Sequence, residues 1–211
     1  MSGEKIVSLN QAAREMLATF SKDGSQDLFI TAAVITFGGV AALHTPPTAA
    51  DQVNWKDLNT DGGTPMGEAF ALAKQLIEDK AKIPSRAYRP TVVLVSDGQP
   101  TDDWQKPLQA FVKEGRSSKC DRMAMAIGSD ADESVLSNFI QGTSHPLYRA
   151  ANAGQIHEFF RRVTMSVTLR AASKTPNEIP GPINPASAKE GTDKQSSAEP
   201  TNPAGEQGGY W

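Results

Sequence analysis

The sequence has little of what several protein classes require. It holds one cysteine, Cys120, in 211 residues, so it cannot form an internal disulfide and nothing in it demands an oxidising compartment. Its apolar stretches are too short for a membrane-spanning helix, and the first ten residues lack the apolar segment of a secretory signal. These absences predict a cytoplasmic protein with no membrane partner. Cys120 itself fits a small residue at the start of a buried strand.

Positive charge is also scarce. The chain carries 21 Lys and Arg against 24 Asp and Glu, a net charge of −3, and no long basic block. Proteins that bind nucleic acid or anionic lipid usually gather Lys and Arg on one face or along one helix. The charge pattern therefore argues against nucleic acid as a partner.

Large aliphatic residues nearly disappear at the C-terminal end. From residue 174 onward, six prolines are mixed with Gly, Ser, Lys, Glu and Asn, and only Ile179 and Ile183 are aliphatics larger than Ala. Such a segment buries too little apolar area to offset the entropy of ordering it. We therefore expect a folded domain over residues 1–171 and a disordered tail over 172–211. The tail ends in two aromatic residues, Tyr210 and Trp211, which either form a docking peptide or have no specific role.

The rest of the sequence alternates between helical and strand patterns. Apolar residues with helical spacing predict a helix from Ile6 to Phe20, and further helices begin near Thr64, Trp104, Glu133 and Ile156. Short apolar runs predict strands, which lie at residues 28–38, 40–44, 91–95, 122–128 and 146–150. Alternating strands and helices with continuously apolar strands predict an α/β fold, a doubly wound and mostly parallel sheet with helices on both faces.

Two loops stand out because ligands of open α/β sheets bind beyond the carboxyl ends of the strands. The first contains Gly62, Gly63 and Thr64, where two glycines allow a tight turn before a hydroxyl. The second contains Asp97 and Gly98 at the end of a strand, and the carboxylates of Asp102 and Asp103 follow. We take these seven residues as the candidate ligand-binding set.

Hydroxyl and carboxylate oxygens suit Mg²⁺ or Mn²⁺, whereas zinc would need Cys and His at ligand spacing, which are missing. Each feature also has a purely structural interpretation. Thr64 fits an N-cap and Asp97–Gly98 a strand-ending turn. Asp102 and Asp103 fit solvated acids near the start of the helix at Trp104, where negative charge is favourable.

The combination resembles the von Willebrand factor A domain family. The stretches GGTPMGEAF and RPTVVLVSDGQPTDDW are particularly similar to its small bacterial TerY-like, or tellurite-resistance-like, branch, and the similarity covers about residues 1–170. The resemblance implies a metal-ion-dependent adhesion site (MIDAS) with Thr64 and Asp97 as metal ligands. It further implies binding of a partner protein whose carboxylate completes the metal shell, in a stress or tellurite-resistance system with a protein kinase and a metal-dependent protein phosphatase as candidate partners.

The chain departs from that family in one respect. Family members place an Asp-x-Ser-x-Ser loop after a central first strand, and this sequence begins just after the position of that loop. Two of five expected ligand side chains remain, so the resemblance predicts weak cation binding. Two hypotheses follow: either the native start lies upstream and Met1 is internal, or the chain is this short and pairs its open strand edges with a partner strand.

Enzyme function is the main rival interpretation. An Mg²⁺-dependent hydrolase or phosphatase would use Asp97, Asp102 and Asp103, but no His or Lys adjoins them as a proton carrier and no Gly-x-Ser-x-Gly motif occurs. We therefore expect a protein-binding module without catalytic activity, in which the metal-site face contacts the partner. In a third interpretation, Tyr210 and Trp211 dock on a partner and the domain is a scaffold.

Overall fold

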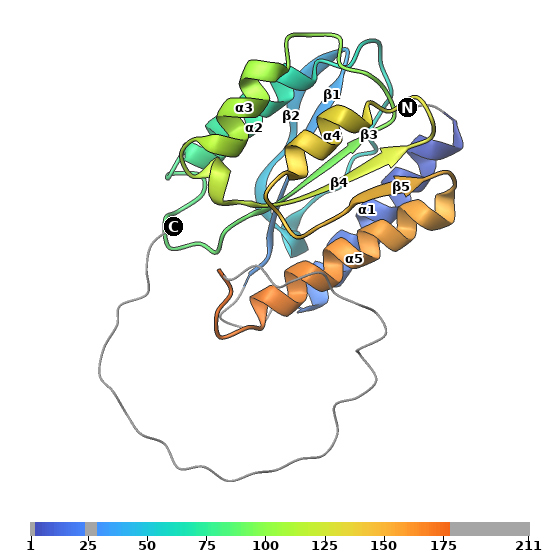
Figure 1. The fold of residues 1–211 in the computed structure, drawn as a ribbon. Coiled ribbons are helices and arrows are strands. Elements are labelled where there is room, and N and C mark those ends of the chain that lie inside the picture. Colours follow the sequence, from blue (N-terminus) through green and yellow to red (C-terminus); the bar gives the residue numbers. More distant parts are fainter. Residues whose placement is uncertain (1–2, 24–28, 178–211) are drawn as a thin grey trace, which may run out of the picture.

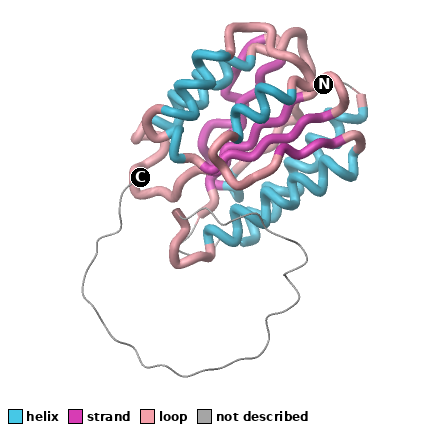
Figure 2. Tube along the Cα trace, in the orientation of Figure 1, coloured by secondary structure: helices cyan, strands magenta, loops and turns pink. Residues whose placement is uncertain are grey.

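The computed structural model describes residues 3–23 and 29–177, which form an α/β domain (Figure 1). Its helices are α1 (Glu4–Asp23), α2 (Met66–Glu78), α3 (Gln105–Lys113), α4 (Glu133–Ile140) and α5 (Ala153–Ala171), with 3₁₀ turns η1 (Ala50–Gln52) and η2 (Ser117–Lys119). Its strands are β1 (Thr31–Gly38), β2 (Val40–Ala49), β3 (Thr91–Ser96), β4 (Asp121–Ile127) and β5 (Leu147–Ala150). Figure 2 shows helices on both sides of the strands, which confirms the predicted α/β class.

The described strands form two sheets. β3, β4 and β5 are parallel, with β4 in the centre, and pair in register from Thr91 opposite Asp121 onward. β1 and β2 form a separate antiparallel hairpin, whose turn at Gly39 needs a positive φ of 73° that glycine adopts without strain. The prediction of a mostly parallel sheet thus holds for β3–β5, and the predicted antiparallel neighbour at residue 40 is β2.

The hairpin extends further than the apolar pattern indicated. β2 runs to Ala49 and includes Pro46 and Pro47, whereas the sequence predicted a strand over 40–44. The pairing register shifts between Ala32 and Val34 on β1, opposite the two prolines. Proline lacks a backbone N–H, so it is tolerated where the hydrogen-bond ladder is already interrupted.

Two apolar cores lie on opposite faces of the parallel sheet. Helices α2, α3 and α4 cover one face, and their core contains Phe70, Phe111 and Phe139. Helices α1 and α5 cover the other, and their core contains Leu9 and Phe159. Every residue of β4 is buried, as expected for a central strand covered on both sides.

Charged residues are buried at the amino-terminal end of the parallel strands. The Asp121 side chain is 0% exposed, and its carboxylate oxygens lie 3.0 and 3.2 Å from His145 Nε2. Arg170 Nη1 lies 3.8 Å from the same carboxylate and donates to Thr91 Oγ1 at 2.8 Å. This cluster joins the end of α5 to β3 and β4. His145 lies in the loop before β5, and no pattern in the sequence indicated its buried partner.

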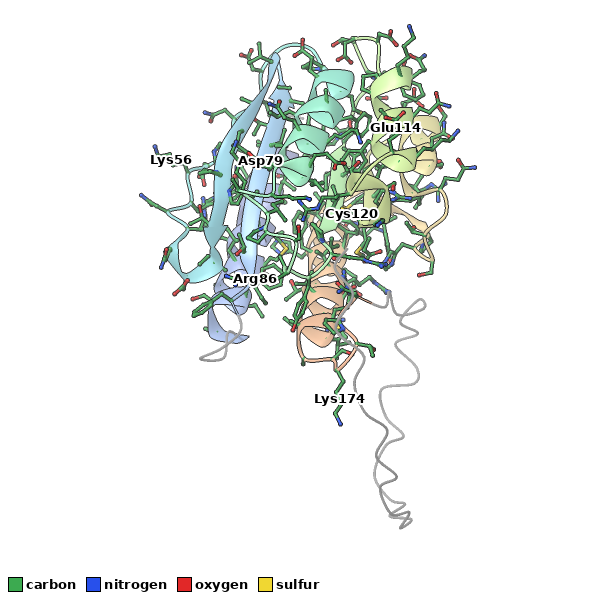
Figure 3. All side chains as sticks on the ribbon, turned by 90° about the vertical axis from the view of Figure 1, so that its left-hand side faces the viewer. Lys56, Asp79, Arg86, Glu114, Cys120 and Lys174 are labelled. Atoms are coloured by element: carbon green, nitrogen blue, oxygen red, sulfur yellow. The ribbon has the colours of Figure 1, made fainter. Side chains whose placement is uncertain are left out.

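Cys120 is buried directly before β4, as predicted, and Figure 3 shows it among the side chains of the interior. Burial raises the pKa of its thiol to about 12, which makes it unreactive at neutral pH. At the other end of the predicted domain, α5 ends at Ala171, and Lys174 projects beyond it (Figure 3).

Two sequence predictions cannot be compared fully with the structure. The predicted tail over 172–211 is described only as far as residue 177, and Tyr210 and Trp211 lie outside the described residues. None of the described helices is both long and apolar enough to cross a membrane.

Candidate functional site

The two predicted loops meet at the carboxyl-terminal end of β3. The loop before α2 is held against the β1–β2 turn, where the N–H of Gly39 donates to the carbonyl of Gly63 at 2.9 Å. The loop after β3 begins with a tight turn in which Ser96 Oγ lies 3.3 Å from both the N–H and the carbonyl oxygen of Gly98. Asp97 is the central residue of that turn.

Thr64 and the Asp97 loop are direct neighbours. A Cβ atom on Gly98 would lie 3.4 Å from Thr64 Oγ1, which is ordinary van der Waals contact. The hydroxyl therefore sits against the residue that follows Asp97. The structure thus brings together two segments separated by more than 30 residues, at the rim where the sequence analysis expected them.

The N-cap interpretation of Thr64 is wrong. Helix α2 begins at Met66, its N-cap position is Pro65, and no side chain of that residue caps it. The carboxylate of Asp102 instead accepts hydrogen bonds from the N–H groups of Gly67 and Glu68, at 3.0 and 2.9 Å. These N–H groups, which have no acceptor within the first turn of the helix, are satisfied here by an acid from a distant loop.

The predicted role of Asp102 changes accordingly. Sequence analysis placed it near the start of α3, the next helix along the chain, whereas its carboxylate serves the start of α2. Asp103 is exposed, and its backbone carbonyl lies so close to Gly67 that a Cβ there would overlap it. The structure therefore separates these two acids, one engaged with backbone and one facing solvent.

Thr101 is a site residue that sequence analysis missed. Its hydroxyl accepts from the N–H of Thr64 at 2.9 Å, and its own N–H donates to the carbonyl of Thr64 at 3.0 Å. A Cβ on Gly63 would lie only 2.9 Å from Thr101 Oγ1, so glycine is required for this approach. The sequence signal was weak, because a threonine after Gly-x-Pro is common in loops.

A second missed neighbour is Asp61. Its carboxylate oxygen lies 3.2 Å from where a Cβ on Gly39 would sit, so it stands at the β1–β2 turn. Gly62, which follows it, has a positive φ of 27° and provides the turn into Gly63. The loop thus brings the Asp61 carboxylate near the rim, although sequence analysis did not include Asp61 among the candidate ligands.

The donor chemistry of the site fits a hard divalent cation. Thr64 and Asp97 supply a hydroxyl and a carboxylate, which are oxygen ligands that Mg²⁺ and Mn²⁺ accept. Among residues 3–23 and 29–177 there is no group of three or more His, Cys, Asp or Glu side chains that could hold a metal ion.

Comparison with known proteins matches residues 2–162 to the von Willebrand factor type A domain. No match was found among curated proteins. Among solved structures, a von Willebrand factor type A protein from Catenulispora acidiphila is 18% identical with a TM-score of 0.57, over 77% of this chain and 38% of that one.

Two further structures share the fold. The ArnB paralog VWA2 from Sulfolobus acidocaldarius is 17% identical with a TM-score of 0.53, over 76% of this chain and 40% of that one. Proximal thread matrix protein 1 from the mussel byssus, with a zinc-occupied MIDAS motif, is 15% identical with a TM-score of 0.56, over 78% and 40%. The chain thus spans about two-fifths of the length of these three structures. The match over residues 2–162 shows that the chain belongs to the von Willebrand factor type A domain family.

Proposed function

We propose that this chain is a cytoplasmic protein-binding module that uses a MIDAS-type site, without catalytic turnover. The observation that carries the proposal is the position of the Thr64 hydroxyl, whose oxygen lies 3.4 Å from where a Cβ of Gly98 would sit, next to Asp97 at the carboxyl-terminal rim of the sheet. The two oxygen donors would hold Mg²⁺ or Mn²⁺, and a carboxylate of a partner protein would enter the remaining coordination positions.

The engagement of Asp102 favours binding over hydrolysis. A hydrolase built on Asp97, Asp102 and Asp103 would need its carboxylates free to hold metal or move protons. Asp102 already accepts two backbone hydrogen bonds at the start of α2. Turnover of a generic phosphoester with Mg²⁺ that is lost in Asp97→Ala would overturn the non-enzymatic assignment.

The partner we propose is a component of a bacterial stress or tellurite-resistance signalling system. The similarity of the two loop motifs to the TerY-like branch supports a protein kinase or a metal-dependent protein phosphatase as that partner. This part of the proposal depends on the motifs alone.

We also propose that residues 1–211 lack the central first strand and the Asp-x-Ser-x-Ser loop of the family. Support comes from the sheets, because β1 pairs only with β2 and β3 pairs only with β4 among the described strands. A strand between β1 and β3 would pair both open edges, and each unpaired buried backbone group costs about 1–3 kcal/mol. Sequencing the N-terminus of the native protein distinguishes an upstream start from a chain that begins at Met1.

The proposed binding is tested with a purified candidate kinase and phosphatase. Each is titrated against the chain in Mg²⁺ and in chelator. We expect binding that requires the cation and falls at least about tenfold in Thr64→Ala and Asp97→Ala, the loss typical of a charged contact. The control Asp51→Ala removes an exposed acid of η1, outside the two loops, and should bind normally.

Deleting residues 174–211 separates the loops from the tail. Binding that survives the deletion but is lost in Thr64→Ala assigns the interaction to the metal-site face. Binding that is lost on deletion and insensitive to chelator would assign it to the tail and refute the MIDAS proposal.

A further inference from the structure

The geometry points to Thr101 and Asp102 as positioning residues that fix Thr64 beside Asp97 before any cation binds. We call this pair the Thr101–Asp102 clamp. The inference rests on the proposed function, because it assigns roles at the same site. It deepens that proposal by stating what orients the ligands.

The clamp joins two segments that the sheet alone does not connect. Thr64 precedes α2, which packs on β1, β2 and α3, while Asp97 ends β3. In the described strands, β1 and β3 belong to different sheets, so no strand ladder sets the distance between the two loops. The core that α2 shares with Leu94 of β3 sets it broadly, and contacts between the loops fix it locally.

Four hydrogen bonds from two adjacent residues supply those contacts. Thr101 pairs with Thr64 through its hydroxyl and its N–H, at 2.9 and 3.0 Å. Asp102 pairs with the N–H groups of Gly67 and Glu68, at 3.0 and 2.9 Å. Thr101 fixes the backbone of the ligand residue itself, and Asp102 fixes the helix that follows it.

The hydrogen bonds of the clamp do not use the proposed ligand atom of Thr64, its side-chain hydroxyl. Thr101 contacts the backbone N and O of Thr64 and not its hydroxyl, which instead faces Gly98. The carboxylate of Asp102 faces backbone amides, so its negative charge is directed at the start of α2. Orientation and ligation are thus divided between neighbouring residues, and such support keeps a binding site in its productive geometry.

Single-residue variants test the clamp. Thr101→Val removes the hydroxyl with little change of shape, and Thr101→Ser retains it. Asp102→Ala removes both acceptor oxygens, and Asp51→Ala, at an exposed acid of η1 outside both loops, is the control for charge. All five proteins, wild type included, are first compared in thermal unfolding and circular dichroism, which establishes that the variants used are folded.

Two measurements are then made on the full chain. Amide hydrogen exchange without metal reports the clamp at Thr64, Gly67 and Glu68. Paramagnetic broadening of backbone NMR signals by Mn²⁺ reports whether Thr64 and Asp97 approach one cation, even at millimolar affinity. The probe is Mn²⁺ alone, so no partner is required.

We expect Thr101→Val to speed exchange at Thr64 by about tenfold and to weaken Mn²⁺ broadening at Thr64 and Asp97 by a similar factor, as the loss of one hydrogen bond predicts. Thr101→Ser should restore both, a rescue that a general loss of stability would not give. Asp102→Ala should speed exchange at Gly67 and Glu68, and Asp51→Ala should change neither measurement.

The outcomes separate this inference from the proposed function. Unchanged exchange and broadening in folded Thr101→Val and Asp102→Ala would refute the clamp while leaving the metal site intact. Wild-type protein that shows clamp-dependent exchange but no Mn²⁺ broadening at Thr64 or Asp97 would refute the metal site and keep the clamp as a device that joins the loops.

Discussion

The buried charge cluster at the amino-terminal end of the parallel strands, formed by Asp121, His145 and Arg170, gives the most quantitative prediction. Asp121→Ala would remove the only carboxylate that the structure places beside Arg170 and His145 in the described part of the chain. Arg170 is 5% exposed, so its guanidinium could not move into water without opening the end of α5. Burial lowers the pKa of Arg170, and the charge of Asp121 opposes that effect.

The expected loss of stability in Asp121→Ala depends on the hydrogen-bond acceptors that Arg170 would retain. Removing one partner of a buried ion pair costs about 3–5 kcal/mol. Arg170 would retain three neutral acceptors, which are Thr91 Oγ1 and the carbonyls of Arg89 and Pro176. We therefore expect the lower limit, about 3 kcal/mol, from a domain whose total stability is about 5–15 kcal/mol. Asp121→Asn keeps the shape and an acceptor for His145, and should cost about 1 kcal/mol.

Urea unfolding of each variant measures these losses, provided that the slope with urea is unchanged. A double-mutant cycle of Asp121→Asn with Arg170→Met isolates the coupling, which we expect at about 1 kcal/mol. Asp51→Asn, at an exposed acid, is the control for charge. A cost below about 0.5 kcal/mol for Asp121→Ala, or strictly additive losses in the cycle, would show that the cluster contributes little to stability.

Three further predictions concern single positions. The thiol of Cys120 has a pKa of about 12 in the folded protein, against 9.0 when it is exposed, so at pH 8 the folded protein should hold about a thousandfold less thiolate than the unfolded chain. The native protein should therefore react with a disulfide reagent correspondingly more slowly than the unfolded chain. Equal reaction rates would refute the burial of Cys120. Asp132→Ala should cost about 1 kcal/mol at pH 7, because its carboxylate caps α4 at Ser134 and Val135, and unfolding in urea measures the loss. Those hydrogen bonds, that of the Ser134 side chain first, lower the pKa of Asp132 below 3.8. The stabilisation by the ionised carboxylate is therefore fully present above pH 3.8 and is lost as the pH falls through the folded pKa. A loss of stability in Asp132→Ala that is as large at pH 2 as at pH 7 would contradict this. Gly67→Ala should destabilise the protein by about 1–3 kcal/mol in thermal unfolding, because its Cβ would overlap the Asp103 carbonyl, whereas Gly154→Ala, which meets only ordinary contacts, should not.

Local patterns predicted the elements of the fold well. The apolar stripe from Ile6 to Phe20 lies within α1, and helix α4 begins at Glu133, as predicted. Both depend on spacing within one segment, which the sequence displays directly. The extension of β2 through two prolines depended on the register of the opposite strand, which no pattern within β2 reveals.

The site was predictable only in part, for the same reason. The two loops were recognisable from Gly62–Thr64 and from Asp97, because strand ends and glycine turns leave local signals. The role of Asp102 was not, since the sequence offers α3 as the nearest helix start while the carboxylate reaches α2, 34 residues earlier in the chain. Likewise, nothing local pairs His145 with Asp121, 24 residues away.

The two ends of the parallel strands use polar groups in opposite ways. At the amino-terminal end, Asp121 and Arg170 are buried and bind one another, so their loss acts on global stability. At the carboxyl-terminal end, Thr101 and Asp102 bind backbone atoms and leave Thr64 Oγ1 facing the turn at Gly98. A ligand-binding end must keep oxygen donors both accessible and fixed, and neighbours that hold the backbone meet both needs. Variants at this end should therefore change local exchange more than the unfolding temperature, and a screen by melting temperature alone would select the structural end and miss the proposed binding site.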